Sequence, residues 1–161
     1  MAFDPATLAR LVARAEALVD RLEAVLPHPP AAPDWSASTA FRYRRCGAGG
    51  RLEPVRHVAT IRLASLVEVD SQKDKLVRNT EQFVAGKSAN NVLLTGSRGT
   101  GKSSLIKACL NEFAPRGLRL IEVDKTDLVD LPDIVDLVAE RPERFVVFCD
   151  DLSFDEGEPG Y

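Results

Sequence analysis

The sequence predicts an α/β fold with a parallel sheet, and three observations support this prediction. Short apolar runs at residues 92–95, 118–123 and 145–149 are separated by two segments of helical periodicity. The first run lacks polar alternation, as is typical of strands covered on both faces. A strand–helix–strand–helix–strand order favours a parallel sheet with right-handed crossovers.

The N-terminal segment, residues 1–35, is expected to form an amphipathic helix followed by a stiff spacer. Asp4 and Pro5 are typical of a helix start, because the first turn does not need the N–H that proline lacks. The proline-rich tract 27–33 ends the helix. Apolar residues recur every three or four positions and form one stripe: Leu8, Leu11, Val12, Ala15, Leu18, Val19, Leu22 and Leu26. We expect this stripe to pack on the core of the same chain or on another subunit.

Residues 36–65 form an arginine-rich segment with two strand-like stretches, 40–45 and 55–63, joined by a glycine-rich turn at 47–50. Between residues 36 and 63 there are six arginines and one acid, whereas residues 120–161 hold thirteen acids and three basic residues. We favour the interpretation that these are two solvated faces of opposite sign. The alternative is that the arginines meet phosphate groups of a nucleotide or a nucleic acid.

Residues 66–161 are expected to form the core of the fold. Helices are predicted from Asp70 to about Ala85, from the glycine-rich turn after residue 95 to about Phe113, and from Asp130 to Pro142. With 161 residues, 45% of them hydrophobic, the chain is long and apolar enough for one globular domain.

Composition favours a cytoplasmic protein. Cys46, Cys109 and Cys149 show no metal-ligand spacing and suggest a reducing compartment. No stretch approaches the roughly 20 apolar residues of a membrane span, and the N-terminus does not read as a signal peptide. His28 and His57 stand alone, so neither is a candidate ligand or base.

The strongest motif is GSRGTGKS at Gly96–Ser103, which matches G-x-x-x-x-G-K-(S/T) in full. Its glycines allow backbone angles and a close approach that a Cβ would block. The loop amides can then converge on phosphate oxygens at the positive end of the following helix. The predicted binding residues for a nucleoside triphosphate are Gly96, Ser97, Arg98, Gly99, Thr100, Gly101, Lys102, Ser103 and Ser104. Lys102 would meet the β- and γ-phosphates, and the Ser103 hydroxyl would ligate magnesium.

Asp150 and Asp151 directly follow the third apolar run, at the strand end where ligands bind in open α/β sheets. Asp150 is placed to hold Mg²⁺ through its waters, opposite Ser103. Asp151 could orient or deprotonate the attacking water. The alternative is that both acids cap the strand and lead into the acidic stretch 155–158.

These motifs resemble the AAA+ branch of P-loop ATPases. More narrowly, NNVLLTGSRGTGKSS and FVVFCDDLSF resemble an uncharacterised bacterial ATP-binding AAA+ family, with weaker resemblance upstream at 50–54 and 66–86. The resemblance implies ATP as the nucleotide, adenine contact near residues 66–69, and rings with ATP at subunit boundaries. It also implies a catalytic role for Lys102 and for the residue after Asp150. That residue is Asp151 where most AAA+ proteins have glutamate, so its carboxylate would lie further from the attacking water.

The resemblance also implies an incomplete AAA+ domain. Such domains place a further strand, later in the chain, between the loop strand and the Asp-Asp strand, and they add a sensor residue, an arginine finger and a helical lid. Because the chain stops at Tyr161, we expect the N-terminal part of a longer ATPase. The sheet would then have a gap with unpaired backbone groups on both sides, and nucleotide binding and hydrolysis would be weak.

The leading hypothesis is an ATPase that remodels or loads an unknown protein or nucleic-acid partner, as a homo-oligomer and away from membranes. One alternative is a nucleotide-responsive binding module without hydrolysis. Another is a small-molecule kinase that shares the loop. A GTPase is disfavoured, because Asp150 lacks a glycine three residues later and no Asn-Lys-x-Asp motif is present.

Overall fold

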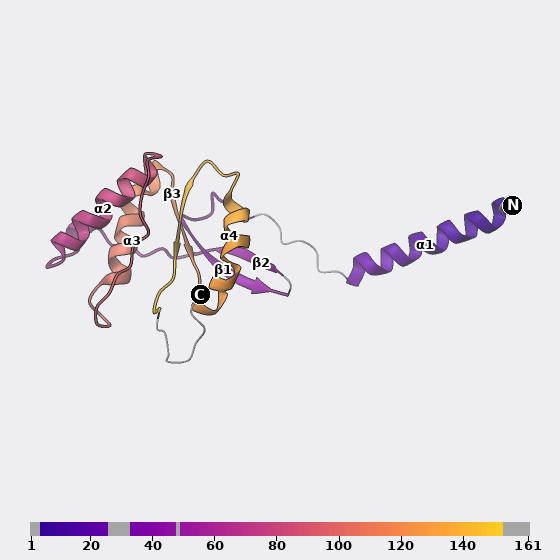
Figure 1. Ribbon diagram of the computed structural model, residues 1–161, viewed down its shortest axis with the longest axis horizontal. Helices are drawn as coiled ribbons and strands as arrows, with labels where there is room; N and C mark the ends of the chain where they lie inside the picture. The colour runs from indigo at the N-terminus through magenta and orange to yellow at the C-terminus, as the bar shows by residue number, and fades with distance from the viewer. Residues whose placement is uncertain (1–3, 26–32, 48, 153–161) are drawn as a thin grey trace. The chain divides into compact units, whose positions relative to one another are not determined.

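A computed structural model describes residues 4–25, 33–47 and 49–152 of the chain. They belong to two units, one within Met1–Ala31 and the other within Ala32–Tyr161. The first unit is the helix α1, Pro5–Val25, which begins at the proline that the sequence predicts (Figure 1). The carboxylate of Asp4 accepts hydrogen bonds from the Ala6 amide at 3.4 Å and from the Thr7 hydroxyl at 3.2 Å.

The second unit is built on one sheet, formed within the described residues by four strands in the order β2-β1-β3-β4. The strands are β1 (Ala40–Cys46), β2 (Gly49–Pro54), β3 (Leu118–Glu122) and β4 (Arg144–Phe148). β1 pairs with β3 and β3 with β4 in parallel, whereas β2 pairs antiparallel with β1. The fold is therefore α/β with a mostly parallel sheet, as the sequence predicts.

Helices cover both faces of this sheet (Figure 1). They are α2 (Asp70–Val84), α3 (Lys102–Phe113) and α4 (Leu131–Val138). Short 3-10 turns precede α2 (η1, Leu63–Ser65), follow α3 (η2, Ala114–Arg116) and precede α4 (η3, Lys125–Asp130). Among the residues that the structure describes, no helix is long and apolar enough to cross a membrane.

The core has two clusters because neighbouring strand residues point to opposite faces of the sheet. Leu120 of β3 joins α2 and α3 residues in one cluster, which includes Leu76, Leu105, Cys109 and Leu110. Its neighbour Ile121 joins the other cluster, with Phe41, Tyr43 and Ile134 of α4. The positions of Cys109 in a helical segment and of Cys149 in an apolar run predict that both are small core residues. This is confirmed for Cys109, which is 3% exposed, whereas Cys149 is only half-buried because it follows the end of β4.

The strand predicted at 55–63 is wrong. The second strand is β2, and it uses Gly49 and Gly50, which the sequence analysis assigns to a flexible turn. A Cβ on Gly50 would overlap the buried phenol ring of Tyr43, so glycine is needed at this position. Packing of an aromatic ring over a glycine is a contact between strands, which the composition of the turn does not reveal.

The strand predicted at 92–95 is not formed either. Residues 91–95 are in no β-ladder, and Leu93 is 75% exposed. β4 lies at the edge of the sheet and pairs with β3 alone among the described strands. A strand needs a neighbour for its N–H and C=O groups. The segment before the loop is therefore without a ladder in the described part of the chain.

Three exposed arginines of β1 pair with acids of the acidic stretch, so the two stretches are solvated, as the favoured interpretation expects, but they are not separate faces. Arg42 pairs with Glu122 at 2.6 Å, Arg44 with Asp124 at 3.3 Å and Arg45 with Asp130 at 2.7 Å. The Tyr43 hydroxyl also donates to Asp130, at 3.2 Å. Burial, followed by the nearby Asp130 charge, raises the pKa of Tyr43 to about 12. These three arginines therefore have carboxylate partners within the chain.

Candidate functional site

The loop Gly96–Ser103 connects the extended segment 91–95 to α3. Gly99 and Gly101 have φ angles of +83° and +84°, a region that residues with a Cβ rarely adopt. Gly101 is the residue before α3, and its carbonyl accepts the Leu105 amide at 2.8 Å. The glycines therefore let the chain turn sharply from the extended segment into the helix.

Side chains of the loop hold it in a closed turn. The Lys102 ammonium donates to the carbonyl oxygens of Gly96 at 2.9 Å and Ser97 at 2.8 Å. The Thr100 hydroxyl donates to the same Ser97 carbonyl at 2.9 Å. Lys102 thus projects into the concave side of the turn, a position from which its charge can reach an anion in the loop.

The first turn of α3 adds backbone donors beside this lysine. The amides of Lys102, Ser103 and Ser104 donate to no acceptor in the described part of the chain. Such amides carry the positive end of the helix dipole. Together with Lys102 they make this end of α3 suited to phosphate oxygens.

The remaining loop side chains make no such contacts. Those of Ser97 and Arg98 are exposed, and that of Ser104 is half-buried. None of these three side chains has a hydrogen bond or ion pair with another described residue, although the backbone carbonyl of Ser97 accepts from Lys102 and Thr100. Their assignment to the binding site stays a prediction.

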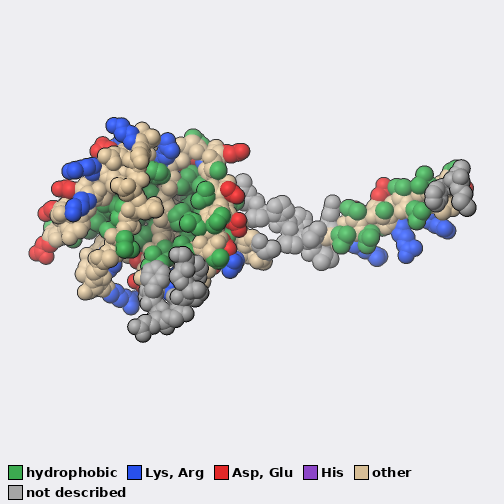
Figure 2. All heavy atoms as spheres, viewed as in Figure 1, with side chains coloured by type: hydrophobic (Ala, Val, Ile, Leu, Met, Phe, Trp, Pro, Cys, Tyr) green, Lys and Arg blue, Asp and Glu red, His purple; other side chains and the backbone are tan. Residues whose placement is uncertain are grey.

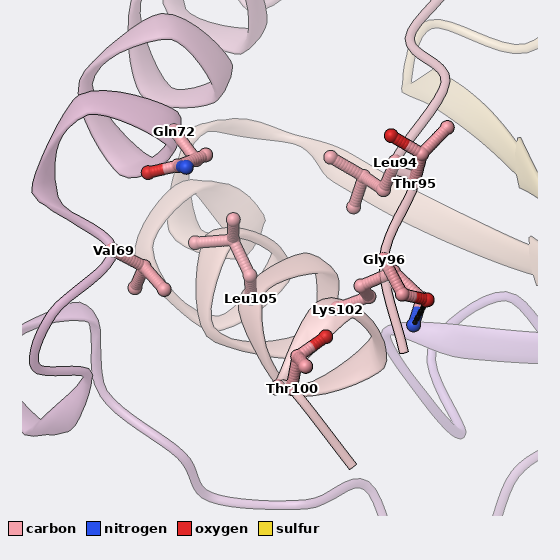
Figure 3. Close-up of a pocket in the computed structure, with 9 residues that line it drawn as sticks. Val69, Gln72, Leu94, Thr95, Gly96, Thr100, Lys102 and Leu105 are labelled. Atoms are coloured by element: carbon pink, nitrogen blue, oxygen red, sulfur yellow. Dashed lines mark hydrogen bonds between the residues drawn. The ribbon is translucent and has the colours of Figure 1, made fainter. Parts of the chain in front are cut away.

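A cavity of about 210 Å³ opens beside the loop (Figure 3). Figure 3 shows Val69 and Gln72 of the α2 side facing Leu94, Thr95 and Gly96 across it. The other lining residues are Thr100, Gly101, Lys102 and Leu105. One end of the cavity is thus mainly apolar, and the other end is formed by the glycine-rich loop.

The structure changes which residues are candidates for base contact. Of the expected segment 66–69, only Val69 lines the cavity, while Leu66 packs against the core. Sequence reasoning missed Gln72 and Leu105. Gln72 stands three positions after Val69, so the helical period could have placed it on the same face.

Ser103 and Asp150 are brought together across the fold. The Ser103 hydroxyl donates to Oδ2 of Asp150 at 2.7 Å, although the two residues are 47 positions apart in sequence. Asp150 follows β4, and its Oδ1 accepts the amide of Asp151 at 3.1 Å. This is the juxtaposition expected from the sequence, and it results from β4 ending beside the start of α3.

The donor set at this contact fits Mg²⁺. A hydroxyl and a carboxylate are hard oxygen ligands, and Mg²⁺ binds through one or two protein ligands while keeping several waters. No group of three or more His, Cys, Asp or Glu side chains that could hold a metal occurs among the described residues. A magnesium ion at this place would therefore take most of its ligands from water and phosphate.

Asp151 is less firmly placed than Asp150. Its φ angle is +51°, in the left-handed region that aspartate tolerates better than most residues. Its carboxylate is exposed and bonds to no other residue in the described ranges. Asp151 thus lies shortly after the end of β4, and no contact within the described ranges orients its side chain.

Two further groups lie near this edge. Burial, with additional effects from the charges of Asp124 and Asp150, raises the pKa of the Cys149 thiol. Asp124 follows β3 and pairs with Arg44. The sequence did not indicate Asp124 as a site residue. Its carboxylate pairs with Arg44, whereas Ser103 bonds to Asp150.

Comparison with known proteins gives a family and a short segment match. Residues 36–161 match the model of the family described as "Protein of unknown function (DUF815)". A segment of 67 residues is 36% identical to the replication factor C large subunit of Staphylothermus marinus, and it covers 41% of this chain but 15% of that protein. No solved structure matches the chain. Because the family model spans most of the sequence, this chain belongs to the DUF815 family.

Proposed function

We propose that this chain carries the nucleotide-binding core of an AAA+-type ATPase that binds ATP with Mg²⁺ at Gly96–Ser103. The observation that carries the proposal is the 2.7 Å contact between Ser103 and Asp150. It joins a hydroxyl of the loop to a carboxylate after a parallel strand, the two protein groups that a phosphate-bound magnesium needs. The segment match to a replication factor C large subunit supports the AAA+ relation at a coarse level.

The residues have distinct roles in this proposal. Lys102 exchanges its bonds to the Gly96 and Ser97 carbonyls for bonds to the β- and γ-phosphates. The first amides of α3 donate to phosphate oxygens, and Val69, Leu94 and Leu105 provide apolar contact for the base. When bound, Mg²⁺ neutralises developing negative charge on the phosphates. Asp151 accepts a proton from the water that attacks the γ-phosphorus.

The proposed activity of the whole protein is remodelling of an unknown protein or nucleic-acid partner, in a homo-oligomer. The second candidate function is nucleotide binding without hydrolysis. The unanchored side chain of Asp151 favours this function. A short carboxylate with no hydrogen-bond partner among the described residues is poorly held for proton transfer.

Asp150→Asn is expected to remove the gain in ATP affinity that magnesium provides. An amide in place of the carboxylate loses the charge that faces the metal and its waters, while the loop itself stays intact. The measurement is a titration with a fluorescent ATP analogue, with Mg²⁺ and with a chelator. We expect magnesium to tighten binding by wild type about tenfold or more and to have little effect on the variant, since a charge-assisted bond contributes about 1.5–3 kcal/mol.

Asp124→Asn is the matched control for that experiment. It removes the same charge at the end of the neighbouring strand β3, where the carboxylate pairs with Arg44. The control should keep the magnesium dependence of wild type. An undiminished magnesium effect in Asp150→Asn, or a wild-type chain without ATP affinity, would contradict the proposal.

Asp151→Asn is expected to leave ATP affinity unchanged and to lower steady-state phosphate release by about 10²-fold or more, the scale of a lost general base. The amide keeps the shape of the side chain but cannot accept a proton. Equal turnover by variant and wild type would remove Asp151 from the mechanism. ATP binding with no phosphate release by wild type would instead select the non-hydrolysing candidate.

A further inference from the structure

The helix α1 exposes a continuous apolar stripe. Six of its large apolar side chains are between 49% and 58% exposed: Leu8, Leu11, Val12, Leu18, Val19 and Leu22. Figure 2 shows hydrophobic side chains along α1, and arginine side chains along its lower edge in that view. A helix of this kind gains most of its stability from packing of its apolar face.

The spacing of the stripe favours another helix as its partner. Leu8, Leu11, Ala15, Leu18 and Leu22 follow each other at intervals of three, four, three and four residues. This is the heptad repeat of helices that wind around each other, with these residues at the first and fourth positions. A strict seven-residue repeat keeps the same stripe facing a second helix over several turns.

Two valines widen the stripe beyond a simple two-helix seam. Val12 and Val19 occupy the fifth heptad position and are as exposed as the leucines. An apolar fifth position in addition to the first and fourth is the pattern of helices in bundles. The stripe can therefore contact more than one neighbouring helix at once.

The charged residues beside the stripe distinguish the two orientations of such helices. Arg14 and Arg21 occupy the seventh heptad position. In a parallel arrangement that position faces the fifth position of the next helix, where the arginine stems can cover valine. In an antiparallel arrangement Arg14 of one helix would face Arg21 of the other, and like charges repel.

The charge of α1 also argues against a membrane surface as the partner. Residues 4–25 contain four acids and three arginines. Helices that lie on anionic membranes carry an excess of basic residues on the polar face. The small net charge instead permits several copies of the same helix to come together.

We propose that α1 is an oligomerisation helix that packs in parallel against the α1 helices of further copies of this chain. The inference does not depend on the proposed nucleotide site, because it rests on a unit that is separate from residues 32–161. In a parallel bundle, all copies of the chain continue from the same end of the bundle.

Sedimentation velocity of the full chain over a wide concentration range tests this proposal. Leu18→Glu puts a charge into the seam and is expected to raise the dissociation constant by at least about tenfold. Ala13→Glu puts the same charge on the opposite face of α1 and should leave the oligomer intact. A wild-type chain that stays monomeric would overturn the proposal. The same holds for a monomeric chain that binds phosphatidylserine vesicles instead. An oligomer that Leu18→Glu does not dissociate would also overturn it.

Leu11→Cys, made in a chain with the exposed Cys46 replaced by serine, tests the orientation. Parallel packing brings the two introduced thiols into the same layer, so an added disulfide-forming oxidant should link copies covalently. In the antiparallel register each thiol would face Leu22 of the other copy. Oligomers that form no more cross-link than the Cys46→Ser parent would overturn the parallel arrangement.

Discussion

Lys102→Ala is expected to weaken ATP binding in the presence of Mg²⁺ by roughly 10- to 100-fold. Hydrogen bonds to a charged group contribute about 1.5–3 kcal/mol, and each 1.4 kcal/mol is a factor of ten in affinity. The Lys102 ammonium already lies inside the turn, 2.9 Å from the Gly96 carbonyl oxygen and 2.8 Å from that of Ser97. Among the described residues, Lys102 supplies the only mobile positive charge on the concave side of the loop, and alanine removes that charge.

Lys107→Ala is the matched control for the lysine experiment. Lys107 is in the same helix, α3, and its removal changes the net charge equally, but it does not line the cavity. A titration with a fluorescent ATP analogue should separate the two variants. Lys102 also bonds to loop carbonyls, so its removal can lower stability as well as affinity. Thermal unfolding of both variants should therefore be measured beside the ATP titration. Equal affinity of wild type and Lys102→Ala would contradict the proposed site.

Gly50→Ala is expected to lower the free energy of unfolding by about 1–3 kcal/mol, the usual cost of overpacking a core. The added Cβ would overlap the ring of Tyr43, a fully buried residue of β1 that shares a core cluster with Ile134 and donates to Asp130. The ring must move to make room, and it then loses both its packing and that hydrogen bond. Urea unfolding followed by tryptophan fluorescence of Trp35, which packs against the same core cluster, measures the change.

Gly49→Ala is the control for Gly50→Ala. The two glycines are neighbours in β2, but a Cβ on Gly49 would have no atom within 4 Å. Its effect on stability should stay within about 0.5 kcal/mol. If both alanine variants unfolded at the same urea concentration, the contact between Tyr43 and Gly50 would not matter for stability.

Local patterns in the sequence were sufficient to place the helices and the loop, although α4 ends at Val138, before the predicted end at Pro142. α2 begins at Asp70 and ends beside Ala85 as predicted, and Gly101 directly precedes α3. These features depend on residues within one or two turns of each other, because helix hydrogen bonds and turn angles are local. For the same reason the motif at Gly96–Ser103 predicted a turn that leads into a helix. The meeting of Ser103 with Asp150 followed once both were assigned to the same sheet edge.

The strands and the charged contacts depended on partners far away in the chain. Residues 92–95 have the composition of a strand, but no ladder forms there because the sheet supplies no neighbour. Gly50 belongs to β2, at a position where the Tyr43 ring needs the space of a missing side chain. Arg42, Arg44 and Arg45 pair with acids about 80 positions later because β1 lies beside β3. The sequence by itself determined the local turns, helices and the phosphate-loop motif, whereas only the tertiary structure decided which strands have neighbours and which charges meet. The physical reason is that ladder hydrogen bonds and ion pairs between strands join residues whose distance in space cannot be read from their spacing along the chain.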